Sequence, residues 1–239
     1  MKYLKYLFIF LPISFICNIL GAPAVVVFTA AAFSIIPLAG VLGRATEEIS
    51  VYSGPRIGGF LNATFGNATE LIISIFALKA GLFDVVKASI AGSVIGNILL
   101  VLGMSMFLGG LKYKTQKFNH ELVEFSSSML LFSVIGLSIP AIFTHTINIA
   151  TLNTSRYAIL SLGVAIIMFS IYLLGMFFSF YTHKDLYGAE HQEDVSAIWG
   201  LKKSIIILFC VTILIAFESE ILVSAVEPMS VSIHLSTFF

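Results

Sequence analysis

The stretch GNATELIISIFAL, Gly66 to Leu78, places a glutamate, Glu70, near the start of a run that is mostly apolar. The segment around it, Ile57 to Leu78, is long enough to cross a bilayer as a helix, which takes about 20 residues. A carboxylate at the bilayer centre costs about 2.5–3.5 kcal/mol on insertion scales, so it normally faces a partner, a cavity or an ion. Glu70 is therefore the first candidate for a functional residue.

The composition of the chain is that of an integral membrane protein. Of its 239 residues, 58% are hydrophobic and only 11% are charged, which is far from the balance of soluble proteins. Helices are expected because strands would need the alternating pattern of a closed barrel, which is not seen. We predict an all-α polytopic fold with about seven spans: Tyr3–Leu20, Ala22–Leu42, Ile57–Leu78, Ala88–Leu111, Phe125–Thr144, Tyr157–Tyr181 and Gly200–Phe217.

Charge and motifs exclude several classes of function. The 13 basic and 13 acidic residues cancel, so no nucleic-acid partner is expected, and the partner that the composition implies is membrane lipid. Cys17 and Cys210 lie in apolar stretches without metal-ligand spacing, which argues against a disulfide framework or a zinc site. The chain has no HExxH, GxSxG or P-loop motif, so we expect no enzyme activity and no cofactor.

The basic residues predict the orientation of the chain. With a cytoplasmic N-terminus, only Lys79, Lys87 and Arg156 of the 13 basic residues fall outside, as the positive-inside bias requires. The first span reads as a retained helix, although Lys2 and Lys5 before an apolar core and the small residues near Ala22 also fit a secretory signal peptide. The pattern does not identify a plasma or inner membrane, a vacuole or a plastid.

A short internal repeat links two distant segments. TEEISVYSGP, Thr46 to Pro55, and SEILVSAVEP, Ser219 to Pro228, share a hydroxyl, a glutamate and a proline at the same offsets. The two spans that precede them are five apart, and this odd number predicts an inverted repeat with opposite orientations in the membrane. Little sequence follows Pro228, so we expect the chain to be a fragment, or to need a missing C-terminal repeat or a second chain.

Asn62 and Gly66 precede Glu70 at four-residue spacing and share its helical face. The next span repeats this spacing in Ser89, Ser93 and Asn97. Oxygen ligands without His or Cys suit a hard cation such as Ca²⁺. Protons and such a cation would compete for the same carboxylate oxygens, which is a chemical basis for exchange. One carboxylate matches a divalent charge poorly, and a second acid is expected elsewhere. The candidates for ion and proton binding are Glu70, Asn67, Gly66, Asn62, Ser93 and Asn97, with Glu70 and Asn97 as metal ligands.

The chain resembles the calcium/proton antiporters of the cation/proton exchanger family. GGFLNATFGNATELI from Gly58, KASIAGSVIGNILLVLG from Lys87 and GRATEE from Gly43 carry the resemblance, with AFESEILV from Ala216 as further support. The resemblance implies exchange of Ca²⁺ for H⁺, with Glu70 alternating between metal and protons. It also implies an N-terminal helix (1–20), a first five-helix repeat (21–181), an acidic cytoplasmic loop (182–199) and the first helix of a second repeat (200–239).

Two other functions stay open at this point. One is a sodium-coupled cation exchanger, because the residues around Glu70 do not separate sodium from proton coupling. The other is a truncated, non-transporting membrane protein that pairs with or regulates a complete exchanger. The acidic loop reads either as a solvated linker or as a regulatory, cation-sensing segment through Glu190, Glu193 and Asp194.

Overall fold

The computed structural model describes residues 4–146, 154–182 and 197–234, and the regular elements among them are all helices. Five helices are long and apolar enough to cross a membrane, and a bent helix pair makes a sixth span, so the expected all-α membrane fold is confirmed. The chain divides into two compact units, Met1–Lys114 with Asp194–Phe239, and Thr115–Glu193. The spans are Ala24–Gly54, the pair Ile57–Phe65 and Ala68–Lys79, Phe83–Lys112, His120–Phe143, Tyr157–Phe177 and Leu201–Ser232.

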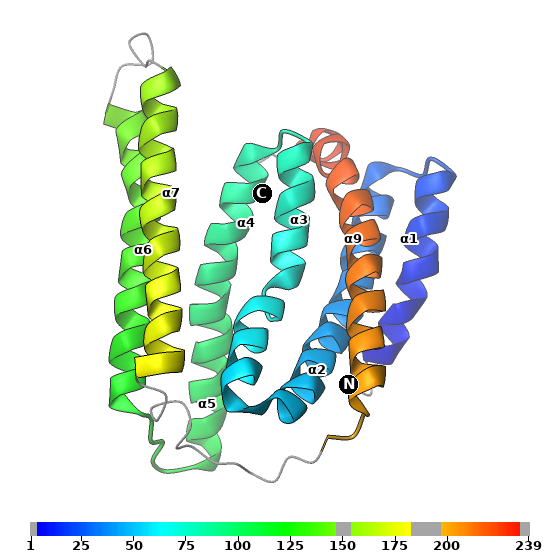
Figure 1. Cartoon of the computed structure of the whole chain (residues 1–239). Coiled ribbons are helices and arrows are strands. Elements are labelled where there is room, and N and C mark those ends of the chain that lie inside the picture. Colours follow the sequence, from blue (N-terminus) through cyan, green and yellow to red (C-terminus); the bar gives the residue numbers. More distant parts are fainter. Residues whose placement is uncertain (1–3, 147–153, 183–196, 235–239) are drawn as a thin grey trace. The chain divides into compact units, whose positions relative to one another are not determined.

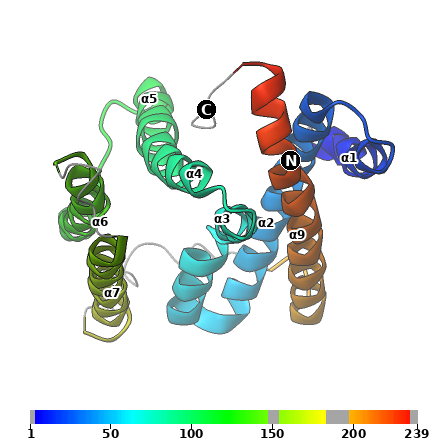
Figure 2. The same cartoon turned by 90° about the horizontal axis from the view of Figure 1, so that it is seen from above.

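The core of the first unit is an antiparallel pair, α2 (Ala24–Phe65) and α9 (Leu201–Ser232). In Figures 1 and 2 the two helices lie side by side and run in opposite directions. The start of α2 therefore meets the end of α9, and Val27 and Ala31 pack against Ile221 and Ala225.

The middle of the α2–α9 pair also holds the first helix against the bundle. Leu38 of α2 and Ile215 of α9 lie in one buried cluster, and Leu11 packs against it. Leu11 belongs to α1 (Phe10–Ile19), which follows the short 3₁₀ helix η1 (Leu4–Ile9). This apolar segment is shorter than the full span expected over Tyr3–Leu20.

Both helices of this pair are longer than hydropathy suggested. The span expected to end at Leu42 continues to Gly54, so the GRATEE segment is helical. The span expected to end at Phe217 continues to Ser232, so that end was predicted wrongly. In both cases the helix runs on through charged residues.

A sharp turn at Gly54 ends the first part of α2. Gly54 has φ 78° and ψ 168°, a backbone conformation that is essentially restricted to glycine. Pro55 follows, and proline both lacks an N–H and disfavours helical conformation in the residue before it. The chain reverses here, and a Cβ atom on Gly58 would lie 2.7 Å from the Cβ atom of Ser50. Pro228, by contrast, lies within the continuous helix α9.

After the turn the chain rises as Ile57–Phe65, bends by 40°, and continues as α3 (Ala68–Lys79). It returns as α4 (Phe83–Gly96), a π-helical segment η2 (Asn97–Leu102) and α5 (Gly103–Lys112). Ala77, Val86 and Val223 form a buried cluster that joins α3, α4 and α9.

The second unit contains α6 (His120–Thr146), α7 (Thr154–Phe177) and the π-helical segment η4 (Phe178–Thr182). Gly136 of α6 packs against the Met168 side chain, and the rings of Phe125 and Phe178 stack with centroids 4.8 Å apart. Small residues at such contacts let membrane helices approach closely.

Candidate functional site

The bent span places Glu70 at the beginning of a half-helix. The first half ends at Phe65, and Asn67 is the N-cap residue of α3, with φ −111° and ψ 13°. Its side-chain amide donates a 3.3 Å hydrogen bond to the carbonyl oxygen of Ala63, which the break would otherwise leave without a partner. Glu70 lies in the first turn of α3, where the helix dipole stabilises negative charge.

Gly66 makes the break possible. Its N–H donates a 2.9 Å bond to the carbonyl oxygen of Asn62. A Cβ atom at Gly66 would collide with that same oxygen, so a larger residue requires the backbone to shift. Discontinuous membrane helices of this kind supply both helix ends and free carbonyl groups to ion sites in transporters.

The hairpin of α3 and α4 brings the second expected stripe to the level of Glu70. Ala77 and Val86 pack together near its tip, and Glu70 lies as far before Ala77 as Ser93 lies after Val86. Because the rise per residue is the same in both helices of the hairpin, Glu70 and Ser93 lie at the same distance from its tip. Asn97 follows Ser93 by four residues at the end of α4, and Gly66 precedes Glu70 by four residues across the break.

Asn97 begins the π-helical segment η2, an irregularity that is frequent at functional sites. Ser93 and Glu70 are half-buried, whereas Asn62, Asn67 and Asn97 are exposed. Among the described residues, none hydrogen-bonds or ion-pairs with the Glu70 carboxylate. In the same part of the chain no group of three or more His, Cys, Asp and Glu side chains could hold a metal ion. Glu70 and Ser93 are thus at one level, and Glu70 is the single carboxylate among the candidate residues.

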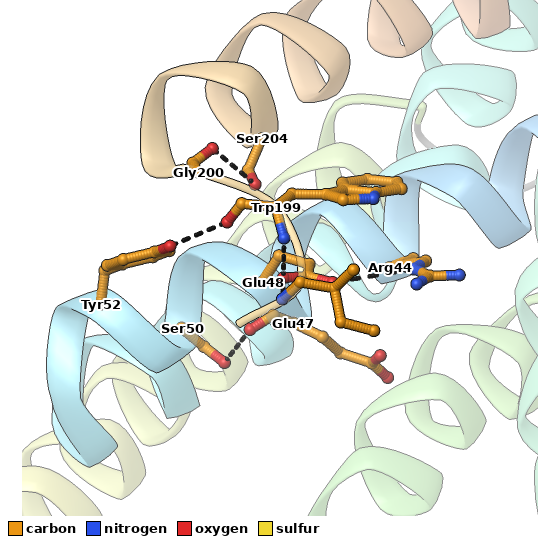
Figure 3. A network of polar contacts seen from close by, with 9 residues as sticks. Arg44, Glu47, Glu48, Ser50, Tyr52, Trp199, Gly200 and Ser204 are labelled. Carbon is orange, nitrogen blue, oxygen red and sulfur yellow. Dashed lines mark hydrogen bonds and ion pairs between the residues drawn. The ribbon is translucent and has the colours of Figure 1, made fainter. Parts of the chain in front are cut away.

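The acidic-loop candidates Glu190, Glu193 and Asp194 lie outside the described residues. The structure does describe the end of that connection. Ile198 and Trp199 donate backbone hydrogen bonds of 2.8 and 2.9 Å to one carboxylate oxygen of Glu48, and Tyr52 donates a 2.8 Å bond to the carbonyl oxygen of Trp199. Figure 3 shows this network, with Arg44 beside Glu48 at 3.8 Å.

The guanidinium of Arg44 also lies 4.9 Å from the centre of the Trp199 ring, within the range of a cation–π contact. Sequence reasoning missed this network. Glu48 was part of a quoted motif, but its partners lie about 150 positions away, and no local pattern indicates them.

A second missed residue is Glu218 of α9. Its side chain is 3% exposed, and the hydroxyls of Ser14 and Ser34 donate hydrogen bonds to it. The predicted span stopped one residue earlier, at Phe217. The apolar run Ile221–Val223 after it is the signal that could have shown that the helix continues.

The chain, with its broken and antiparallel membrane helices, matches a known family of membrane proteins. The family described as "Sodium/calcium exchanger protein" matches residues 23–181. The chain belongs to this family. The match includes the broken span with Glu70, and the resemblance stated from the sequence is confirmed.

Members of the exchanger family with curated names cover nearly the whole chain. The Ca(2+)/H(+) antiporter ChaA of Bacillus subtilis (strain 168) is 43% identical over 95% of this chain and 65% of its own length. The Ca(2+)/H(+) antiporter of Aphanothece halophytica is 42% identical, over 98% of this chain and 66% of its own. Vacuolar cation/proton exchanger 2 of Oryza sativa subsp. japonica is 40% identical over 89% of this chain and 51% of its own length. The chain thus spans about half to two thirds of these relatives.

Solved structures agree with these matches. A crystal structure of the selenium-substituted Ca2+/H+ antiporter protein YfkE aligns with this chain at a TM-score of 0.76 and 38% identity. The alignment covers all of this chain and 66% of the YfkE chain. Native YfkE aligns with a TM-score of 0.74 over 97% of this chain. The helical fold is therefore that of an exchanger, and the chain is a multi-pass membrane protein.

Proposed function

We propose that the chain carries the Glu70 half of a secondary transporter that exchanges Ca²⁺ for H⁺. The observation that carries the proposal is the break at Gly66 and Asn67, which sets Glu70 at the positive end of α3 within a membrane span. The two exchanged ions are taken from relatives at 42–43% identity, which are named Ca(2+)/H(+) antiporters.

The exchange follows from competition at Glu70. A hard cation takes carboxylate, amide and hydroxyl oxygens, and Glu70, Asn67, Asn97 and Ser93 offer these groups on neighbouring helices. Ca²⁺ bound to the carboxylate excludes protons from it, and a proton on the carboxylate removes the charge that holds Ca²⁺. Loading on one side of the membrane with release on the other then couples the two ions.

Ca²⁺ usually takes about six to eight oxygen ligands, more than these side chains supply. The remaining oxygen ligands are assigned to the second copy of an inverted repeat. The antiparallel pairing of α2 with α9 supports such a repeat. Thr46 and Ser219, equivalent in the two short copies, are 1% and 0% exposed, and the glutamates that follow them, Glu47 and Glu220, are both exposed. Equal environments at equal positions of antiparallel helices are what an inverted repeat requires.

Vesicle transport tests the choice of coupling ion. The protein is expressed from its complete coding sequence in membranes without other calcium transporters, and calcium-45 uptake is driven either by a pH gradient or by a sodium gradient. Uptake that follows the pH gradient, with protons released as calcium enters, is expected. Uptake that requires sodium and ignores the pH gradient would replace H⁺ by Na⁺ in the proposal. No uptake under either gradient would favour the non-transporting membrane protein.

A further inference from the structure

Glu218 joins three helices inside the first unit. The hydroxyl of Ser14 on α1 lies 2.7 Å from each carboxylate oxygen of Glu218, and the hydroxyl of Ser34 on α2 lies 2.6 Å from one of them. Both serines are 0% exposed and Glu218 is 3% exposed. The three side chains therefore form a closed polar cluster between α1, α2 and α9.

Apolar packing encloses this cluster on both sides. Ile215, about one turn before Glu218, lies in the buried cluster with Leu38, and Ile221, about one turn after it, lies in the cluster with Val27. Water and lipid headgroups are thus kept from the carboxyl group by side chains on each side along α9.

No cation neutralises Glu218 within the described residues, whose ion pairs are Arg44–Glu48 and Lys87–Asp84. Arg44 is ten residues beyond Ser34 along α2, about 15 Å away in a helix. The titratable neighbour on α1 is Cys17, one turn after Ser14, which packs near Ile221. An isolated buried charge of this kind is costly, and a carboxyl group can avoid the cost by taking up a proton.

The serines can serve both the ionised and the protonated carboxyl group. The hydroxyl of Ser14 lies 3.0 Å from the carbonyl oxygen of Leu11, and that of Ser34 lies 2.8 Å from the carbonyl oxygen of Ala31. When Glu218 is ionised, each hydroxyl donates its single proton to the carboxylate. When Glu218 is protonated, its O–H donates to one serine, and that serine turns its proton to its own helix.

We infer that Glu218, with Ser14 and Ser34, is a reversible proton-binding site in the seam between α1, α2 and α9. Binding adds one proton to a carboxylate oxygen, and release returns that proton to solvent, with no other bond made or broken. The ligand is a proton rather than Ca²⁺, because one carboxylate and two hydroxyls fall short of the about six to eight oxygens that Ca²⁺ takes. This site is distinct from Glu70 and does not depend on calcium exchange there.

Infrared spectroscopy of the purified protein in detergent, titrated with acid and base, tests the site without a transport assay. The readout is the carbonyl stretch that only a neutral carboxyl group has. We expect a band that falls as pH rises, that is absent from Glu218→Gln, and that remains in Glu220→Gln, which removes an exposed acid two residues away on the same helix. Glutamine can accept from one serine and donate to the other, so this variant is expected to fold.

Removal of one serine hydroxyl gives a second readout. Ser14→Ala and Ser34→Ala each take away one hydrogen bond to the carboxyl group, and each is expected to move the midpoint of the band by about one pH unit. These variants test the site even if Glu218→Gln does not fold.

Three results would overturn the inference. The first is a wild-type spectrum that equals that of Glu218→Gln at every pH, which means an always ionised carboxylate. The second is a Glu218 band that does not change with pH, which means a permanently neutral hydrogen-bonded group. The third is loss of the band on addition of Ca²⁺ to Glu70→Gln, which would make Glu218 itself a metal ligand. Failure of exchange at Glu70 would leave the expected titration unchanged.

Discussion

The carboxylate of Glu48 on α2 accepts a 2.9 Å hydrogen bond from the backbone N–H of Trp199, just before α9 begins at Leu201. The same oxygen accepts the N–H of Ile198 at 2.8 Å. α2 thus holds the start of the helix that packs along it, and it does so a few residues before the turn at Gly54. The end of the connection after residue 182 is therefore coupled to the most sharply bent part of α2.

Loss of the Glu48 carboxylate should destabilise this joint. Glu48 is 7% exposed, and hydrogen bonds to charged groups contribute about 1.5–3 kcal/mol each. Glu48→Ala leaves the amides of Ile198 and Trp199 without this acceptor, so we expect a lower thermal unfolding midpoint in detergent and faster proteolysis next to Ile198. The matched control is Glu47→Ala, an exposed neighbour. Equal midpoints for the two variants would show that the joint contributes no stability.

Gly54→Ala should be costly although nothing crowds the position. No heavy atom lies within 4 Å of a Cβ atom there, so the penalty comes from the backbone conformation alone. Such conformations cost a non-glycine residue about 1–3 kcal/mol. A lower unfolding midpoint is expected for Gly54→Ala, and Gly43→Ala, within the regular helix and with equally open space, should match or exceed the wild type. An unchanged unfolding midpoint for Gly54→Ala would contradict the requirement for glycine at this turn.

Gly66→Ala should disturb the start of α3 and hence Glu70. The new Cβ atom would meet the carbonyl oxygen of Asn62, and relief of that contact must move the break. If strain of about 1–3 kcal/mol falls on the ion-bound state, Ca²⁺ affinity weakens by roughly 5- to 150-fold. Calcium-45 uptake at varied Ca²⁺ concentration measures this change. Gly92→Ala is the control, because the space around Gly92 is open. Equal Ca²⁺ affinity in both variants would show that the break at Gly66 does not contribute to ion binding.

Orientation can be tested by labelling. The excess of basic residues predicts that the connection at Lys114 is cytoplasmic and that Lys87 faces the other side. In a background with Cys17 and Cys210 replaced by serine, Lys114→Cys should react with a membrane-impermeant maleimide only after the cells are opened. Lys87→Cys should react in intact cells. The reverse pattern would invert the orientation.

Apolar length alone predicted the membrane helices, because a spanning helix needs a long apolar run and little else competes with that signal. Their ends were predicted less well. Hydropathy falls after Leu42 and again at Glu218, but α2 and α9 continue. Partners far along the chain, Trp199 and Ser14, satisfy the carboxylates of Glu48 and Glu218 in these extensions. Such partners are set by packing and not by local pattern.

The candidate site divides in the same way. Glu70 stands out from its own neighbourhood, since it is the single acid between Ile57 and Leu78. The level of Ser93 depends on the hairpin of α3 and α4, which spacing within each segment does not determine. The spacing of Asn62, Gly66 and Glu70 assumed one straight helix, whereas the structure bends between Phe65 and Ala68.

The most direct test of the account is calcium-45 uptake driven by a pH gradient, in vesicles that contain either the wild type or Glu70→Gln. Asp84→Asn is the matched control, since Asp84 is an acid at the start of α4 that pairs with Lys87 at 3.4 Å. The account predicts that Glu70→Gln abolishes uptake while Asp84→Asn retains it. Uptake at the wild-type rate in Glu70→Gln would contradict the central claim that this carboxylate carries both ions.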